Sequence, residues 1–147
     1  MVKVFVYGTL RTGDSRYGVD TFVGMLAPEA YINGFDMLDL GSFPGLVANP
    51  DKLSQTVDYE TAIRGEVHEY ENLRVLDVIE GYDEAQPKEG FYSRIQLPAF
   101  TKDGKVLEDC WVYIFNSKSR AGSIIECGDW FEHRGLYAKL AKAGCDV

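Results

Sequence analysis

Two apolar-rich runs in the second half of the chain constrain its fold most. Residues 92–100 and 106–115 each have the length of a β-strand. The link between them contains Asp103-Gly104, a pair that favours tight hairpin turns. We therefore predict an antiparallel hairpin over residues 92–115.

Other parts of the chain also have the character of strands. Residues 2–7 carry apolar side chains on both faces, which is typical of a central strand paired on both sides. Asn33-Gly34, between two short apolar runs, predicts a type I′ hairpin turn. Further short strands are expected over residues 24–31, 35–38, 43–47 and 63–70.

Helical signals are fewer and lie between and after the strands. Residues 73–80 are expected to form a helix that begins after Asn72 as its N-cap and ends at Gly81. Asp129 and Glu132 have the spacing of a capping box for a second helix near the end of the chain. The predicted fold class is α+β: a small, mixed, mostly antiparallel β barrel with flanking helices. With 147 residues and 46% hydrophobic content, we expect one domain over residues 1–147.

Charge and cysteine content exclude several classes of function. A net charge of -8 disfavours nucleic acid and anionic membranes as partners. Cys110, Cys127 and Cys145 are odd in number and widely spaced, so we expect neither a disulfide framework nor a zinc site, and a cytoplasmic location fits best. His68 and His133 have no partners at metal-ligand spacing, which predicts that no metal is bound. No signal peptide or membrane-spanning run is evident.

Glu80 is the residue with the clearest chemical potential. In a helix over residues 73–80 it would lie on the side of Leu73 and Leu76, which faces the core. Gly81 would place it at the negative end of the helix dipole. Burial and dipole both raise the pKa of a carboxyl towards the range that a general base needs. The alternative is that Glu80 turns aside and only solvates the end of the helix.

Residues 7–10, Tyr-Gly-Thr-Leu, follow the first strand directly and open a long loop. Unpaired backbone N–H groups at such a strand end can converge on an anion, and a carboxylate would fit. An ordinary strand end is the alternative, and no phosphate-loop pattern is present. Tyr113 lies in the alternation Trp111, Tyr113, Phe115, which predicts a core or cavity face where the Tyr113 hydroxyl needs a buried partner or a ligand.

Seven short strings in sequence order resemble the gamma-glutamylcyclotransferase-like family. They are Phe5–Arg11, Phe22–Gly24, Phe43–Val47, Gly65–Val67, Leu76–Gly81, Tyr92–Arg94 and Trp111–Ile114. Each string is weak alone, whereas seven in order are specific. The resemblance spans about residues 2–116; the segment 82–91 is acidic and fairly long, and the tail beyond 116 matches only loosely.

The resemblance implies a small, mostly closed barrel with a cavity at its mouth and release of 5-oxoproline from gamma-glutamyl compounds. It implies no cofactor and no metal, and a small-molecule gamma-glutamyl substrate as the partner. The substrate-binding loop of the family falls on Tyr7, Gly8, Thr9 and Leu10, and its acid/base glutamate falls on Glu80. Arg11 and Tyr113 are further substrate-binding residues that it implies.

The expected chemistry is intramolecular. The substrate's own α-amine attacks its γ-carbonyl, and Glu80 moves the proton from the amine to the leaving group. Two alternatives stay open: a non-catalytic small-molecule binding module on the same barrel, and removal of a gamma-glutamyl group from a larger carrier or crosslink. The sequence predicts neither the oligomeric state nor the physiological substrate.

Overall fold

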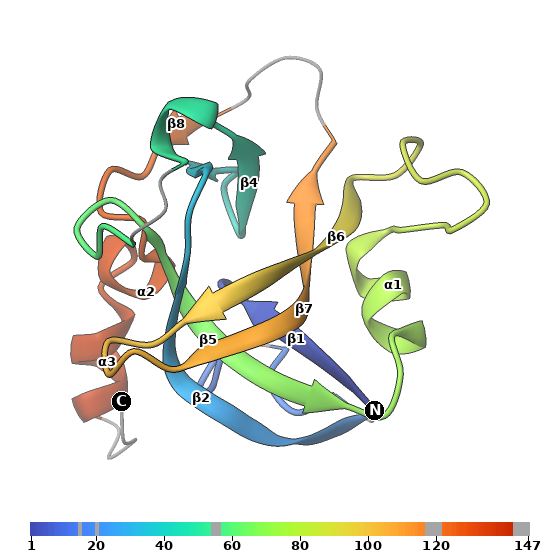
Figure 1. Cartoon of the computed structure of the whole chain (residues 1–147), viewed down its shortest axis with the longest axis horizontal. Helices are drawn as coiled ribbons and strands as arrows, with labels where there is room; N and C mark the ends of the chain where they lie inside the picture. The colour runs from blue at the N-terminus through green and yellow to red at the C-terminus, as the bar shows by residue number, and fades with distance from the viewer. Residues whose placement is uncertain (15, 20, 54–56, 117–121, 143–147) are drawn as a thin grey trace.

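The computed structural model describes residues 1–14, 16–19, 21–53, 57–116 and 122–142 (Figure 1). Its strands are β1 (Val2–Val6), β2 (Phe22–Ile32), β3 (Phe35–Asp39), β4 (Pro44–Ala48), β5 (Ile63–Tyr70), β6 (Tyr92–Phe100), β7 (Val106–Phe115) and β8 (Ser123–Ile124). Its helices are α1 (Arg74–Glu80), α2 (Trp130–His133) and α3 (Leu136–Lys142), with a 3₁₀ turn at Pro50–Lys52.

Five strands close into a barrel in the order β1-β5-β2-β6-β7. β1 pairs antiparallel with β5 and parallel with β7, where Val4 lies opposite Trp111. The other pairs in the barrel are antiparallel. α1 lies on one side of the barrel, and α2 and α3 lie on the other (Figure 1). The predicted α+β fold, a mixed and mostly antiparallel barrel with flanking helices, is confirmed, as is the central place of the first strand.

The predicted hairpin over residues 92–115 is confirmed. β6 and β7 pair from Tyr92 opposite Phe115 to Phe100 opposite Val106, with a register shift between Leu97 and Ala99. Gly104 takes a φ of 87°, which L-residues with a side chain rarely adopt. This explains the glycine in the turn.

The hairpin predicted at Asn33-Gly34 is wrong. Gly34 does turn the chain with a φ of 90°. However, β2 pairs with β5 and β6 in the barrel, whereas β3 pairs with β4 and β8 in a separate three-stranded sheet. The Asn-Gly pair signals a bend, and the two runs beside it pack in different sheets because their apolar faces find longer-range partners.

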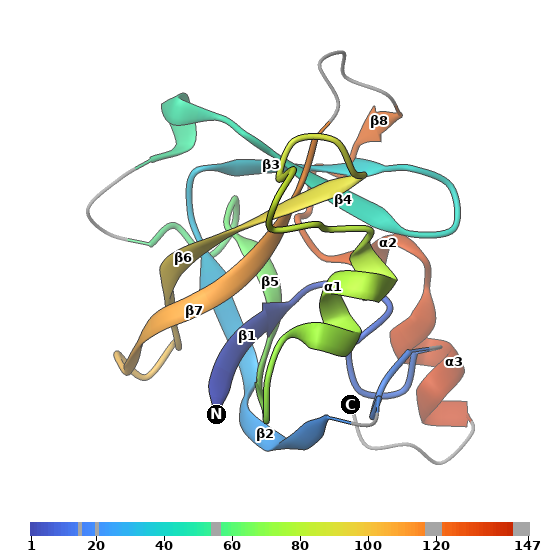
Figure 2. The same ribbon diagram turned by 90° about the vertical axis from the view of Figure 1, so that its right-hand side faces the viewer.

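α1 ends as expected and begins one residue later than expected. Gly81 has a φ of 67°, and its N–H bonds the Val78 carbonyl at 3.2 Å. Leu73 occupies the N-cap position, while the Asn72 side chain still accepts the Arg74 N–H at 3.0 Å. The short helix lies beside β1 with its C-terminal end directed towards the loop that joins β6 (Figure 2).

The C-terminal segment completes the packing of the barrel. Asp129 caps α2 by accepting the N–H groups of Phe131 and Glu132, and Trp130 and Phe131 are almost fully buried. Both aromatic side chains join the core cluster that contains Phe5, Ile32 and Val67. Among the described residues, no helix is long and apolar enough to cross a membrane.

Candidate active site

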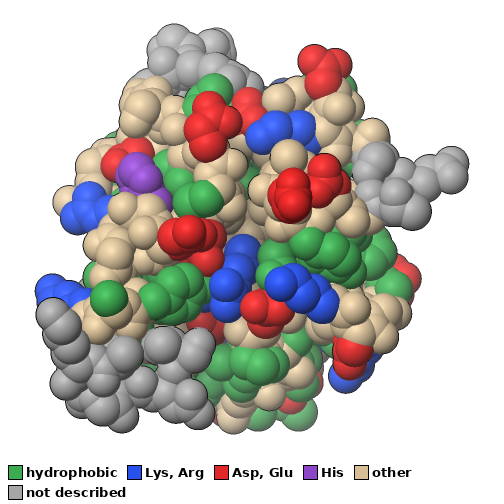
Figure 3. Space-filling model, turned by 90° about the vertical axis from the view of Figure 1, so that its left-hand side faces the viewer, with side chains coloured by type: hydrophobic (Ala, Val, Ile, Leu, Met, Phe, Trp, Pro, Cys, Tyr) green, Lys and Arg blue, Asp and Glu red, His purple; other side chains and the backbone are tan. Residues whose placement is uncertain are grey.

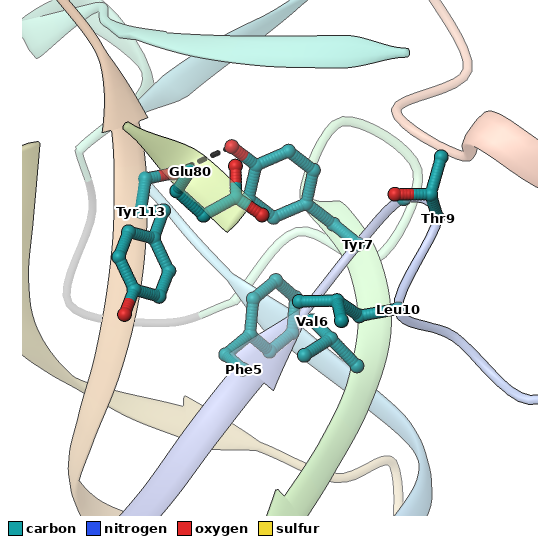
Figure 4. Close-up of a pocket in the computed structure, with 8 residues that line it drawn as sticks. Phe5, Val6, Tyr7, Thr9, Leu10, Glu80 and Tyr113 are labelled. Carbon is teal, nitrogen blue, oxygen red and sulfur yellow. Dashed lines mark hydrogen bonds between the residues drawn. The ribbon is translucent and has the colours of Figure 1, made fainter. Parts of the chain in front are cut away.

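A small cavity lies where β1 and α1 both end (Figure 4). Its volume is about 30 Å³, little more than a water molecule occupies. The lining residues are Phe5, Val6, Tyr7, Gly8, Thr9, Leu10, Glu80 and Tyr113. The fold thus brings the loop over residues 7–10, Glu80 and Tyr113 together, although they lie far apart in the sequence.

The Glu80 side chain points from the end of α1 towards the Tyr7 ring (Figure 4). Burial raises the pKa of its carboxyl to about 7, and the positive charge of Arg16 opposes this rise. Within the described chain, the carboxyl has no hydrogen-bond partner. The predicted direction of the pKa shift is confirmed, and loss of solvation is its main cause.

The loop after β1 is held in a tight turn by hydrogen bonds to its own carbonyl groups. Arg11 N–H donates to the Gly8 carbonyl at 3.0 Å, and Arg16 N–H donates to the Thr9 carbonyl at 2.8 Å. A Cβ on Gly8 would lie 2.8 Å from the Pro44 ring, so a side chain does not fit there. No backbone N–H of Gly8, Thr9 or Leu10 donates to another described residue. Gly8, Thr9 and Leu10 thus line the cavity together with Glu80, and their N–H groups have no acceptor in the described chain.

Two tyrosines form the wall of the cavity. The Tyr7 hydroxyl donates to the Tyr113 carbonyl at 2.5 Å, as the dashed line in Figure 4 marks. The Tyr113 hydroxyl points away from Glu80 and donates to Asp77 Oδ1 at 2.6 Å. Burial and Asp77 together raise the pKa of Tyr113, so its hydroxyl stays protonated. Tyr113 thus lines the cavity, and both its carbonyl and its hydroxyl have protein partners.

Arg11 does not line the cavity, although it directly follows the loop. Its side chain is buried, with Nε 3.0 Å from Glu66 Oε2 and Nη1 3.0 Å from Asp129 Oδ1. Nη2 donates to the Tyr137 hydroxyl at 2.9 Å. The guanidinium is fully engaged in the protein interior. These contacts anchor the loop, and the substrate contact that the resemblance implied for Arg11 stays a prediction.

Glu66 and Asp129 hold Arg11, a role that the sequence did not predict for either residue. Glu66 also accepts the Thr12 N–H at 3.0 Å and faces His68 Nε2 at 2.9 Å. Asp129 joins the network to Arg64, whose guanidinium lies 3.0 Å from Glu29 at the surface. On this side of the molecule, basic and acidic side chains lie next to each other near the centre of the face (Figure 3).

A wider cleft lies beside Gly81, just after the end of α1. It has a volume of about 450 Å³ and is lined by Gly81, Glu89, Gly90, Phe91, Phe115 and Asn116. Gly81 follows Glu80 directly, and Phe115 lies two residues after Tyr113 on the same strand. The small cavity and the wider cleft are therefore lined by neighbouring residues of the same two elements.

The possible metal ligands of the described chain are scattered or already paired. No group of three or more His, Cys, Asp or Glu side chains in this part of the chain has the arrangement of a metal site. His68 contacts Glu66, and His133 lies 2.8 Å from Asp39. Cys110 is a buried free thiol in the core.

Comparison with known proteins assigns the chain to one family. The family model of gamma-glutamyl cyclotransferase, AIG2-like proteins matches residues 4–132. A Vibrio cholerae protein with the provisional name gamma-glutamylcyclotransferase is 30% identical over 129 residues, which cover 86% of this chain and 93% of that protein. A Niallia circulans protein, named gamma-L-glutamyl-butirosin B gamma-glutamyl cyclotransferase, is 26% identical over 150 residues, covering all of this chain and 86% of that protein.

Solved structures show the same fold at lower identity. An AIG2-like protein from Mus musculus superposes with a TM-score of 0.63 at 23% identity, covering 88% of each chain. YkqA from Bacillus subtilis gives a TM-score of 0.65 at 22% identity, covering 94% of this chain and 42% of that one. The chain belongs to the gamma-glutamyl cyclotransferase, AIG2-like family. It is therefore classed with a family of enzymes that act on gamma-glutamyl substrates.

Proposed function

We propose that this protein releases 5-oxoproline from a small gamma-glutamyl amide, with Glu80 as the proton shuttle. The observation that carries the proposal is the meeting of two features in one cavity. The Glu80 carboxyl has a pKa of about 7, and backbone N–H groups of residues 8–10 are available beside it. A carboxyl that titrates near neutral pH can accept and return a proton within one turnover.

The reaction needs one new C–N bond, one broken C–N bond and the transfer of two protons from the α-nitrogen to the leaving amine. Glu80 takes the first proton from the substrate α-ammonium group, and the freed nitrogen attacks the γ-carbonyl carbon. The new C–N bond gives a tetrahedral intermediate with an oxyanion and a ring nitrogen that still carries two protons. Glu80 gives its proton to the departing amine as the old C–N bond breaks. The second proton passes from the ring nitrogen to the released amine through Glu80, which leaves 5-oxoproline, an ammonium group and the starting carboxylate. Because the attack is intramolecular, much of the rate enhancement comes from holding the folded substrate conformer.

The loop supplies the negative-charge recognition that this route requires. The N–H groups of Gly8, Thr9 and Leu10 would hold the α-carboxylate or the oxyanion. The 30 Å³ cavity has to widen to accept the glutamyl group, and the 450 Å³ cleft beside Gly81 offers space for the amine half. Residues 7–10 would thus bind the part that is common to all substrates of the family.

The test is turnover of defined substrates by the purified protein. We expect release of 5-oxoproline from at least one of gamma-glutamyl-alanine, gamma-glutamyl-lysine and glutathione, with the same rate in the presence of a chelator. Glu80→Gln should lower kcat by roughly 10² to 10⁴, the usual contribution of a positioned acid/base, while 5-oxoproline still binds. Glu84→Gln is the control, because Glu84 is an exposed carboxylate nearby. A fully active Glu80→Gln variant would refute the shuttle.

The two alternatives make different predictions in the same assay. A binding module would bind 5-oxoproline and release none from any substrate. Removal of a gamma-glutamyl group from a larger carrier is favoured by one observation, the Niallia circulans relative named for gamma-L-glutamyl-butirosin B. In that case the three small substrates would be poor, and a gamma-glutamyl group on a larger amine would be released faster.

The compartment and the partners are part of the same proposal. We propose that the protein acts in the cytoplasm, which is supported by the free thiols of Cys110 and Cys127. The net charge of -8 supports a small-molecule substrate and disfavours nucleic acid.

A further inference from the structure

α1 is too short to hold Glu80 in place by itself. It has 7 residues, and Leu76 is its one buried side chain among the described residues of the helix. Isolated helices of this length are unstable in water, so contacts with the barrel must fix the helix. A single buried leucine does not determine how the helix is rotated about its axis. A directional contact is needed to decide where Glu80 points.

Asp77 makes that directional contact with two neighbouring strands. Its Oδ1 accepts the Tyr113 hydroxyl at 2.6 Å and Arg94 Nε at 3.0 Å, and its Oδ2 faces Arg94 Nη2 at 3.4 Å. Arg94 on β6 and Tyr113 on β7 are directly opposite partners in the sheet. The carboxylate of Asp77 therefore binds a fixed pair of donors on the barrel wall.

The donors themselves are held rigidly. The Arg94 guanidinium lies 4.7 Å from the centre of the Tyr82 ring and 4.5 Å from that of the Trp111 ring. The side chain of Arg94 is 9% exposed and that of Asp77 is 20% exposed. A planar guanidinium between two rings has little freedom to follow a moving carboxylate. The pair thus fixes the helix to the barrel instead of moving with it.

Asp77 also makes a backbone contact with the residues that follow Glu80. It lies three residues before Glu80, a spacing that places two side chains on adjacent positions of one helix face. Its backbone carbonyl accepts the Tyr82 N–H at 2.8 Å, which closes the helix just beyond Glu80. Asp77 therefore makes contacts on both sides of Glu80: its side chain binds the barrel before Glu80, and its carbonyl binds Tyr82 after it.

We propose that Asp77 is a positioning residue that holds the Glu80 carboxyl over the loop of residues 7–10, with Arg94 and Tyr113 as its anchors. The inference rests on the proposed function of Glu80. Tyr113 joins the two halves of the site, because its ring lines the cavity and its hydroxyl fixes the helix that carries the base.

Electrostatics alone does not explain the arrangement. The titratable groups that interact with the Glu80 charge are Tyr7, Tyr70, Tyr92, Tyr113 and Arg16. Of these, Arg16 carries a charge at neutral pH. The ion pair between Asp77 and Arg94 is close to neutral as a unit. The ion pair therefore acts on Glu80 by fixing where α1 lies. Removal of the Tyr113 hydroxyl, which carries no charge, should reveal this effect.

Tyr113→Phe is the cleanest variant, because it removes the hydroxyl and keeps the charge of the site, the ring and the Tyr113 carbonyl. Two properties are measured: kcat, and the titration midpoint of the Glu80 carboxyl by ¹³C NMR. We expect kcat to fall roughly 3- to 10-fold, the worth of one hydrogen bond. The midpoint should fall below 7, because a helix that is free to rotate lets solvent reach the carboxyl.

Asp77→Asn should have the larger effect, with kcat lower by roughly 10- to 100-fold, as a displaced catalytic group costs. KM should change little, since the loop is intact. Glu84→Gln is the matched control: Glu84 faces the same arginine at 3.8 Å but is 83% exposed, and its loss should leave kcat and the midpoint unchanged.

The inference is overturned if folded Tyr113→Phe keeps the wild-type kcat and the wild-type midpoint of Glu80. A lower melting temperature with both values unchanged has the same meaning, since it would make the contact purely structural. Should Asp77→Asn fail to fold, Tyr113→Phe decides alone. If the wild type turns over no gamma-glutamyl compound, the proposed function fails, and the midpoint of Glu80 still tests the positioning role.

Discussion

Glu66 and Glu80 are two glutamates that the same barrel treats in opposite ways. Glu66 on β5 is 4% exposed and receives hydrogen bonds from Arg11, Thr12 and His68. Its pKa lies below the ordinary value, since these partners outweigh the effect of burial. Glu80 at the end of α1 has no hydrogen-bond partner among the described residues, and burial raises its pKa to about 7.

The difference shows that burial alone does not determine what a carboxyl does. Where donors converge on the carboxylate, as at Glu66, the charged form is the stable one and the group is structural. Where donors are missing, as at Glu80, the group can change its protonation state near neutral pH. The first carboxyl thus holds the loop through Arg11 and Thr12, and the second has the protonation behaviour that the proposed shuttle needs.

Loss of the Glu66 charge should produce the largest change in stability. Glu66→Gln replaces one carboxylate oxygen by an amide that donates, although donors face both oxygens of Glu66. It also leaves Arg11 without one of its two carboxylates. We expect the free energy of unfolding to fall by roughly 3 to 5 kcal/mol at pH 7, as when a buried ion pair is broken. Urea unfolding measures this.

The pH dependence checks the assignment. A lowered pKa means that the contribution of Glu66 is present above the ordinary value of 4.5 and is lost as the pH falls below it. The gap between wild type and Glu66→Gln should therefore close in acid. Glu69→Gln on the same strand is the control, because that side chain lies on the opposite face and should cost little. Equal losses of stability in Glu66→Gln and Glu69→Gln would contradict the structural role of the buried Glu66 carboxylate.

Glu80→Gln should change stability in the other direction. The pKa of Glu80 is raised from 4.5 to about 7 in the folded protein, so ionisation opposes folding. The cost is absent below pH 4.5, grows between pH 4.5 and 7, and is complete above pH 7. At pH 8 we expect Glu80→Gln to be more stable than wild type by up to about 3 kcal/mol, and at pH 4 the two should be equal. A variant that is less stable at pH 8 would mean that Glu80 is structural.

Local sequence signals predicted much of the fold and the surroundings of Glu80. Gly81 after an apolar helix face marks the buried helix end with Glu80, and the strand end at residues 7–10 marks the loop. The turn at Asp103-Gly104 joins strands that do pair with each other, so the sequence signal was sufficient there. At Asn33-Gly34 the same kind of signal failed, because pairing is decided by distant strands.

The hydrogen-bond network of Glu66 could not be predicted from local sequence signals. Arg11 is 55 residues from Glu66 and 118 from Asp129, and no periodicity connects them. Which of 23 acidic residues meets Arg11 follows from barrel closure, a tertiary property. The same holds for Tyr113, where the alternation of aromatic residues predicted a cavity face but not that its hydroxyl turns to Asp77.

Arg16 offers the finest test of the contrast, because its charge, alone among those of the described residues, lowers the pKa of Glu80. Arg16→Ala removes that charge, so the pKa should rise above 7. The shift should stay below about one unit, since Arg16 is exposed and its field is screened by salt. Activity that depends on ionised Glu80 would then be lower near pH 6.5 and unchanged at pH 9, and the acid limb of kcat/KM would move to higher pH.

Arg74→Ala, which removes an exposed arginine at the other end of α1, is the control. Tyr113→Phe should move the same limb to lower pH. If Arg16→Ala leaves the limb in place, or moves it in the direction expected for Tyr113→Phe, then the group that titrates is not Glu80.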